Sequence, residues 1–188
     1  LVLTNNSAMN TLSSTTPGED IVSWSIDPAL SSGLTFNTAN GEISGIPDAL
    51  SVLTVYTISA TNTGGTVTAT VNITVNAVTP VLSYTPDSLV LTNNSAMTTL
   101  SSTTPGEDIV SWSIDPALSS GLMFNTANGE ISGIPDALSV LTVYTISATN
   151  TGGTVTATVN ITVNAVTPVL TYSPDSFILT NNSAMAIF

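Results

Sequence analysis

The chain has 188 residues and carries 12 Asp and Glu but no Lys, Arg, His or Cys, which gives a formal net charge of −12. It therefore has no His or Lys to act as a general base, no thiol nucleophile, no imidazole or thiolate metal ligand, and no cation to neutralise nucleic-acid phosphates. The composition predicts that the protein is not an enzyme and does not bind nucleic acid, and it excludes disulfide bonds.

Charged residues make up only 6% of the chain, whereas hydrophobic residues make up 42%. Most of the rest is Thr, Ser and Asn, which together with Val and Ile are typical of strands and polar turns. No apolar stretch approaches the roughly 18 residues that a membrane helix needs, and Leu1–Asn5 lacks the basic start of a signal peptide. We expect an all-β extracellular or cell-surface protein with no membrane insertion in this segment, and any export signal to lie outside the segment.

One sequence recurs with a period of 88 residues. Residues 1–88 and 89–176 differ at four positions, namely Asn10/Thr98, Thr35/Met123, Ser83/Thr171 and Thr85/Ser173. A unit of this length is large enough to bury its own core, unlike the shorter units of solenoid proteins. The repeat therefore predicts an array of independently folded domains.

The Thr79-Pro80 step is the predicted boundary between units, because proline lacks an amide donor and interrupts strand pairing. On this basis residues 1–78 form a domain that lacks its first strand, and residues 79–166 form a complete domain. Residues 167–188 are then the first strands of a third domain. On this division the chain resembles a segment of a longer array of domains.

Strand donation between molecules is the alternative interpretation of these boundaries. Residues 167–176 would fill the strand position that is missing from residues 1–78 of a neighbouring molecule. Residues 177–188 duplicate residues 1–12 and would be redundant in such a complex. This favours the interpretation of the chain as a segment of a longer array.

The complete unit begins with two expected strands. Val81–Tyr84 follows the boundary and is predicted to be the first strand. Ile109–Asp115 alternates between apolar and polar residues, which places Val110, Trp112 and Ile114 on the inward face.

Two hairpins are predicted next. Asn128-Gly129 lies between Leu122–Phe124 and Ile131, and both of these turn residue types tolerate positive φ. Asn150–Gly153 is predicted to be the turn of the second hairpin, which ends with Thr154–Asn164. The inward face of that hairpin comprises Tyr144, Ile146, Ala148, Val155, Ala157, Val159, Ile161 and Val163. About seven short strands separated by frequent turns indicate a β-sandwich.

Two motifs of the unit resemble a known family. Gly121–Pro135 (Gly-Leu-Met-Phe-Asn-Thr-Ala-Asn-Gly-Glu-Ile-Ser-Gly-Ile-Pro) and Tyr144–Asn150, followed by Gly152-Gly153, resemble the putative-Ig repeats of large bacterial and archaeal surface proteins. The first unit carries the same motifs at Gly33–Pro47, Tyr56–Asn62 and Gly64-Gly65. Those repeats are related to cadherin-like and dystroglycan-type domains.

The resemblance implies tandem Ig-like antiparallel β-sandwich domains. Ile146 stands where immunoglobulin domains carry a cysteine in their F strand, and Trp112 resembles their strand-C tryptophan. The disulfide of those domains is absent, so core packing must hold each domain together.

Carboxylates are the basis of a predicted calcium site, since each period carries six of them and no cation relieves their repulsion. Calcium takes about 6–8 oxygen ligands. The candidate ligands lie in the Thr-Thr-Pro-Gly-Glu-Asp loops or near the boundaries: Glu19, Asp20, Asp87, Glu107, Asp108 and Asp175. The alternative is that they are solvated turn carboxylates, because the Asp-x-Asp ligand strings of cadherins are missing.

Five sequons for N-glycosylation begin at Asn5, Asn72, Asn93, Asn160 and Asn181. Asn72 and Asn160 lie on the outward face of their predicted strand, which is compatible with glycan attachment. Several sequons are expected by chance in a chain so rich in Asn and Thr.

Aromatic residues are predicted to serve packing rather than carbohydrate binding. Trp112, Tyr144 and Phe124 have the inward phase of core residues. Tyr84 and Tyr172, which lie near the boundaries, are candidates for packing one domain against the next.

The leading hypothesis is a structural or adhesive protein in which tandem domains form a cell-surface stalk or thin fibre. Each domain should span about 40 Å, given a 12-residue strand at roughly 3.3 Å per residue. The expected partners are neighbouring repeats or copies of the chain, and also a surface glycan or protein. The alternatives are a glycan- or protein-binding module that uses its loops, and a filament subunit assembled by strand donation.

Overall fold

The computed structural model of the chain describes residues 1–15, 20–103, 108–171 and 181, and this part of the chain forms strands and no helix. Six strands make up what we call the first domain: β1 (Val2–Thr4), β2 (Ser23–Asp27), β3 (Leu34–Phe36), β4 (Ile43–Gly45), β5 (Ser51–Asn62) and β6 (Gly65–Asn76). Eight make up the second domain: β7 (Ser83–Tyr84), β8 (Ser88–Thr92), β9 (Ser102–Thr103), β10 (Ser111–Asp115), β11 (Leu122–Phe124), β12 (Ile131–Gly133), β13 (Ser139–Asn150) and β14 (Gly153–Asn164).

Each domain has a large sheet of four strands, ordered β1-β6-β5-β2 in the first domain and β10-β13-β14-β8 in the second. The pairs β5–β6 and β13–β14 are antiparallel, as are β2–β5 and β10–β13, whereas the edge strands β1 and β8 run parallel to β6 and β14. The short hairpins β3–β4 and β11–β12 form the facing layer, which in the second domain also contains the pair β7–β9. The predicted all-β sandwich is confirmed, with one parallel edge pair in each large sheet.

The long hairpin β13–β14 carries the core of the second domain because its apolar residues alternate with Thr and Asn. Tyr144, Ile146 and Ala148 of β13 are buried, and so are Val159 and Ile161 of β14. The predicted inward face of this hairpin is therefore confirmed.

One predicted inward residue is wrong. Val110 is 69% exposed, although Trp112 is buried and Ile114 packs against the core. Strand β10 begins only at Ser111, so the two-residue alternation does not extend back to Val110. Ile109 packs against the core in its place.

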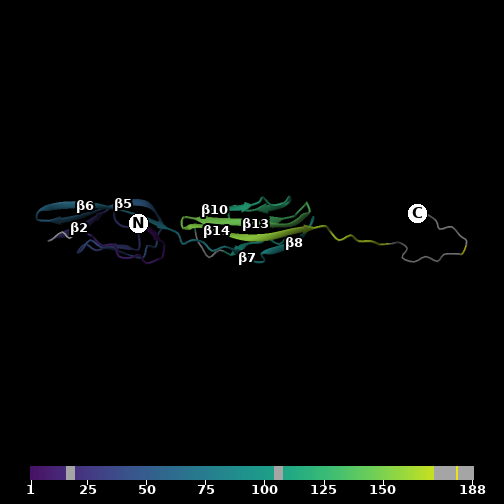
Figure 1. Cartoon of the computed structure of the whole chain (residues 1–188), viewed down its shortest axis with the longest axis horizontal. Coiled ribbons are helices and arrows are strands. Elements are labelled where there is room, and N and C mark those ends of the chain that lie inside the picture. The colour runs from purple at the N-terminus through teal and green to yellow at the C-terminus, as the bar shows by residue number, and fades with distance from the viewer. Residues whose placement is uncertain (16–19, 104–107, 172–180, 182–188) are drawn as a thin grey trace.

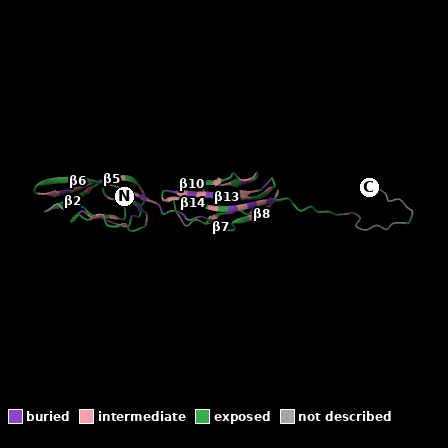
Figure 2. Ribbon diagram, in the orientation of Figure 1, coloured by how far each residue is buried: buried purple, intermediate pink, exposed green. Residues whose placement is uncertain are grey.

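The two domains follow one another along the longest axis of the molecule, and their long hairpins lie close to that axis (Figure 1). Residues 165–171 extend away from the second domain on the side opposite the first (Figure 1). Among the residues that the structure describes, no helix could cross a membrane. Burial differs between the domains, since the long strands of the second domain contain more buried residues than those of the first (Figure 2).

Candidate functional site

Residues 77–82, between β6 and β7, form the linker between the domains, and the β13–β14 turn of the second domain holds this linker. The Asn150 side chain is 4% exposed, and its Nδ2 atom donates a hydrogen bond of 2.7 Å to the carbonyl oxygen of Val78. The Oδ1 atom of Asn150 accepts a bond of 2.8 Å from the amide of Gly152 within the same turn. The asparagine thus orders its own turn and binds the linker at the same time.

Two further hydrogen bonds join the turn to the linker. The amide of Ala77 donates to Thr151 Oγ1 at 2.8 Å, and Thr79 Oγ1 donates to the carbonyl oxygen of Gly152 at 2.9 Å. The backbones approach so closely that a Cβ atom on Gly152 would overlap the carbonyl oxygen of Ala77. Three consecutive linker residues are therefore fixed by three consecutive turn residues, and we call this contact the turn–linker junction.

A turn–linker junction consists of a hairpin turn and a linker. A second such turn lies in the first domain, and a second copy of the start of the linker follows the second domain. The Asn62–Gly65 turn of the first domain has the same internal bond, from the Gly64 amide to Asn62 Oδ1 at 2.8 Å. A Cβ atom on Gly64 would come near Asn62 Oδ1 only, at 3.2 Å, so none of the described residues covers this turn as the linker covers Gly152. At the other end Ala165 is exposed, whereas its counterpart Ala77 is 5% exposed.

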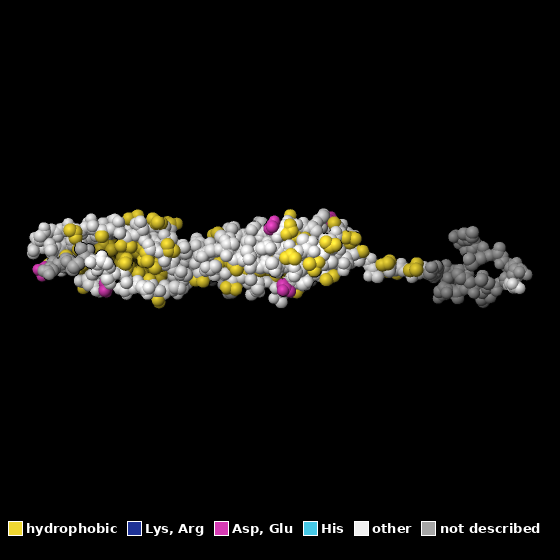
Figure 3. Space-filling model, in the orientation of Figure 1, with side chains coloured by type: hydrophobic (Ala, Val, Ile, Leu, Met, Phe, Trp, Pro, Cys, Tyr) yellow, Lys and Arg dark blue, Asp and Glu magenta, His cyan; other side chains and the backbone are white. Residues whose placement is uncertain are grey.

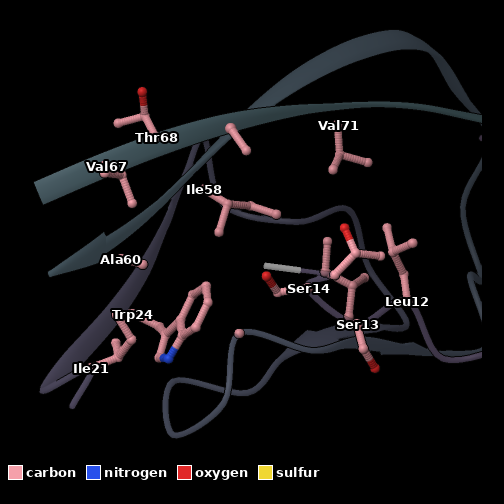
Figure 4. Close-up of a pocket in the computed structure, with 14 residues that line it drawn as sticks. Leu12, Ser13, Ser14, Ile21, Trp24, Ile58, Ala60, Val67, Thr68 and Val71 are labelled. Atoms are coloured by element: carbon pink, nitrogen blue, oxygen red, sulfur yellow. The ribbon is translucent and has the colours of Figure 1, made fainter. Parts of the chain in front are cut away.

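The first domain also contains an apolar cavity of about 500 Å³ between its layers. Figure 4 shows Trp24 and Ile58 among the side chains around it, and Figure 3 shows hydrophobic side chains gathered on this domain. The lining comprises Leu12, Ser13, Ser14, Thr15, Ile21, Trp24, Gly41, Ile43, Ile58, Ala60, Val67, Thr68, Ala69 and Val71. We call this cavity the first-domain groove.

In the second domain the corresponding space is filled by strand β7 and the residues before it. Leu82 and Tyr84 are 8% and 4% exposed and belong to the buried core cluster. Strand β7 pairs antiparallel with β9, and Tyr84 Oη donates a hydrogen bond of 2.7 Å to the carbonyl oxygen of Gly129. Burial raises the pKa of Tyr84 to about 12. A hydrogen bond with the Ser102 side chain lowers this pKa, but by less than burial raises it.

The aromatic predictions have two outcomes. Trp112 and Tyr144 are buried and Phe124 packs against the same core, so their assignment to the core is confirmed. The suggestion that Tyr84 packs one domain against the next is wrong, because its ring lies inside its own domain. Tyr172 lies outside the described residues.

The calcium candidates are only partly described. Glu19, Glu107 and Asp175 lie outside the described residues, while Asp20 and Asp108 are exposed. The carbonyl oxygen of Asp87 accepts a bond of 2.8 Å from the amide of Asn160, midway along β14 and away from the turn–linker junction.

Within the described part of the chain, no three acidic residues come together as a metal site. The carboxylates of Glu42 and Glu130 instead accept hydrogen bonds of 3.1 Å from Ser13 and Ser101. Calcium binding stays a prediction.

The five sequon asparagines occupy different environments. Asn72 is exposed and Asn160 is half-buried, each on the last strand of its domain. The Oδ1 atoms of Asn5 and Asn93 are buried, and Asn181 is exposed. Of the candidates, Asn72 therefore offers the most accessible strand position, and glycosylation stays a prediction.

The sequence contains a signal for the turn–linker junction beyond the hairpin connection that Asn150–Gly153 predicts. Gly153 has φ of +145°, a backbone conformation that favours glycine, and this explains why the position holds glycine. Gly152 has no such φ, and its missing side chain instead allows the Ala77 carbonyl to approach. A second glycine beside a turn glycine can thus indicate a close backbone contact.

Residues 3–76 match the model of one protein family, described as Putative Ig domain. Residues 91–164 repeat this stretch with two differences, Asn10/Thr98 and Thr35/Met123. No curated protein shows significant similarity to the chain.

Solved structures of tandem immunoglobulin domains share the fold. The chain is similar to extracellular domains 3–5 of Drosophila OTK, with a TM-score of 0.52, 20% identity, and coverage of 87% of this chain and 59% of that one. It is also similar to the N-terminal eight Ig domains of Down Syndrome Cell Adhesion Molecule, with a TM-score of 0.53, 17% identity, and coverage of 87% and 23%. For Sidekick-1 immunoglobulin domains 1–4 the TM-score is 0.52, the identity 14%, and the coverage 87% and 46%. The chain thus spans less than two thirds of each of these structures, and the likeness at such identities concerns the fold.

Proposed function

Since residues 3–76 match the Putative Ig domain model and residues 91–164 are a near-identical copy of them, we propose that the chain is a rod-like segment of an extracellular structural or adhesive protein. Its role is mechanical and not enzymatic: it holds whatever it joins at a fixed separation from a cell surface. The observation that carries this proposal is the turn–linker junction, where the turn of one domain fixes the linker to the domain before it.

A closed junction of this kind supports stiffness along the array. A linker with free backbone groups acts as a hinge, whereas the bonded carbonyl of Val78 and the bonded amide of Ala77 resist rotation about the linker. Each domain contributes a separate core, so that load along the rod is divided among independently folded units.

Small-angle scattering of the 188-residue chain tests the rod. We expect the two domains to stay aligned, with a maximum dimension of the folded part of roughly 80 Å from two strands of twelve residues in series. A distribution of bent forms would contradict the proposal.

The surface location needs a separate test. We expect proteinase K to remove the natural protein from intact cells that produce it. Trypsin is unsuitable, because the chain has no Lys or Arg. Protection from proteinase K until the cells are broken would contradict an extracellular role.

Exposed apolar side chains support a second candidate, a module that binds a partner protein. Val52 and Leu53 are 84% and 62% exposed at the start of β5, and Val140 and Leu141 have the same exposures in β13. Neighbouring large apolar side chains that are exposed on a folded domain fit a contact surface. Replacing all four by Thr should abolish adhesion of particles coated with the chain to cells, and unchanged adhesion would remove this candidate.

A further inference from the structure

Each long hairpin contains a bulge that exposes two consecutive apolar side chains. Strand β13 changes its register against β14 between Ser139 and Thr142, so that Val140 and Leu141 lie together opposite a single residue. In a regular strand one of two consecutive side chains would point toward the core. An extra residue in one strand re-aims the side chains beside it, and Val140 and Leu141 are 84% and 62% exposed. The hydroxyl of Thr142 donates a hydrogen bond of 3.1 Å to the carbonyl oxygen of Val140, which holds the bulge in place.

Two valines extend this apolar surface across the outer side of the large sheet. Val143 follows Leu141 by two residues, so both side chains point to the same side, and Val143 is 49% exposed. Strand β8 contributes Val90, which is 72% exposed and pairs with Thr162, the residue opposite the bulge. None of the strands β8, β13 and β14 carries an Asp or Glu. We call the four apolar residues of this surface the bulge patch: Val90, Val140, Leu141 and Val143.

The first domain has an equivalent bulge patch. The hydroxyl of Thr54 donates a hydrogen bond of 3.0 Å to the carbonyl oxygen of Val52 and holds the same bulge. Val2, Val52, Leu53 and Val55 are 70%, 84%, 62% and 50% exposed, nearly the same fractions as in the second domain. The first domain has a domain after it and the second has a domain before it, so neither neighbour covers the patch. The fold of a single domain is therefore what exposes it.

The area of the bulge patches indicates what kind of partner they can bind. Four exposed aliphatic side chains are comparable to the largest apolar patch of an ordinary monomer, about 300–600 Å². A stable and specific complex buries about 800 Å² of each partner. One bulge patch is too small for that, whereas the two patches of the chain together are large enough. The partner must therefore present two apolar patches at the same separation as those of this chain.

We propose that the two bulge patches bind the two bulge patches of a second copy of this chain, which lies alongside the first. The turn–linker junction fixes how one domain follows the other, so both copies have the same separation and the same rotation between their patches. A contact made by the same surface of both molecules closes with two-fold symmetry and produces a dimer. The inference rests on the second candidate function, because it identifies the partner of that surface.

Analytical ultracentrifugation of the 188-residue chain over a wide range of concentrations tests the dimer. We expect a monomer–dimer equilibrium that shifts toward the dimer as NaCl rises from about 0.05 to 0.5 M, because salt screens the repulsion between two chains of net charge −12. A chain that stays monomeric at every concentration would overturn the proposal. A dimer that salt dissociates would overturn it as well, since an ionic contact would then join the molecules.

Two matched pairs of substitutions separate this contact from general stickiness. Val52→Thr together with Val140→Thr should raise the Kd of the dimer by about tenfold or more, because every dimer loses four apolar side chains from its interface. Val22→Thr together with Val110→Thr is the control, since Val22 and Val110 are 70% and 69% exposed but lie outside the bulge patches. All four positions are exposed, so both variants should unfold at the same urea concentration as the original chain. Equal values of Kd for the two variants would contradict the proposal.

Adhesion of coated particles separates this inference from the second candidate function. Particles coated with the chain should clump with one another in the absence of cells, and particles coated with the Val52→Thr and Val140→Thr variant should remain dispersed. Particles that adhere to cells but never to one another would overturn the inference and leave the second candidate function in place.

Discussion

The two domains have almost the same sequence but differ in packing. Between residues 1–78 and 89–166 only Asn10/Thr98 and Thr35/Met123 differ. Trp112 is nevertheless buried where Trp24 is half-buried, and Val155 is half-buried where Val67 is 69% exposed. The difference comes from the residues that precede each domain in the chain, since only the second domain receives Leu82 and Tyr84. We propose that the structural unit is the 88-residue period with its leading strand.

The largest expected effect is a gap in stability between the domains. Burial of side chains the size of Leu82 and Tyr84 contributes about 1.5–3 kcal/mol each, so the first domain should be less stable by about 3–6 kcal/mol. Each domain has one tryptophan, and Trp24→Phe or Trp112→Phe leaves a single fluorescent reporter for urea unfolding. The comparison must be made in dilute solution, where association is negligible. Coincident transitions for the two reporters would contradict the argument.

A single substitution in the leading strand should reproduce part of that gap. Leu82→Ala should destabilise the second domain by about 2–5 kcal/mol, because the residue is buried and leaves a cavity. Leu170→Ala is the matched control, since Leu170 is 79% exposed and should leave the stability of a dilute monomer unchanged. Equal midpoints for Leu82→Ala and the original chain in urea would show that strand β7 does not stabilise the core.

The hydroxyl of Tyr84 should have a smaller effect that depends on pH. Tyr84→Phe removes the bond to Gly129 and should cost about 1 kcal/mol at neutral pH. In the original chain the folded domain keeps the phenol protonated up to a pKa of about 12, above the ordinary value of 10.0. The stabilisation is therefore complete below pH 10 and decreases as the pH rises from about 10 to 12.

The alkaline prediction can be checked by urea unfolding at several pH values with the tryptophan of the second domain as reporter. Tyr84→Phe should lose the part of the pH dependence that arises between pH 10 and 12. An identical pH dependence in both proteins would contradict the assignment of a buried, protonated phenol to Tyr84.

Much of the fold could be predicted from the sequence because it depends on local periodicity. The alternation of Val155, Ala157 and Val159 with Thr is a direct consequence of strand geometry, and it identified the buried face of the hairpin. Val110 shows the limit of this reasoning, because periodicity gives the phase of a strand and not the residue at which the strand begins.

The candidate site was less accessible to sequence reasoning because it consists of contacts between distant parts of the chain. Ala77 and Gly152 are far apart in sequence, and their approach depends on how one domain follows the other. Tyr84 was placed near a boundary by its position in the chain, but the first strand of a sandwich crosses the core of its own domain. The first-domain groove likewise depends on a strand that lies outside the residues that line it, so those residues alone do not indicate it.

The smallest effect on stability, and the most specific test of the rod, is expected from one glycine. Gly152→Ala places a Cβ atom against the carbonyl oxygen of Ala77, so the linker must move away from the turn and the turn–linker junction should open. Gly152 has no positive φ, so the backbone of the turn tolerates alanine and each domain should keep its stability within about 0.5 kcal/mol. Gly64→Ala is the matched control in the first domain, where only Asn62 Oδ1 lies near the added atom, at 3.2 Å.

Small-angle scattering and NMR residual dipolar couplings should then show bent and variable forms for Gly152→Ala and the original aligned form for Gly64→Ala. If both variants stayed equally straight, the hydrogen bonds of Asn150 and Thr79 would not be what aligns the domains. Alignment would then have to come from the short length of the linker alone. Because the two glycines occupy the same position in nearly identical domains, any difference between the variants isolates the contribution of the linker that only one of them touches.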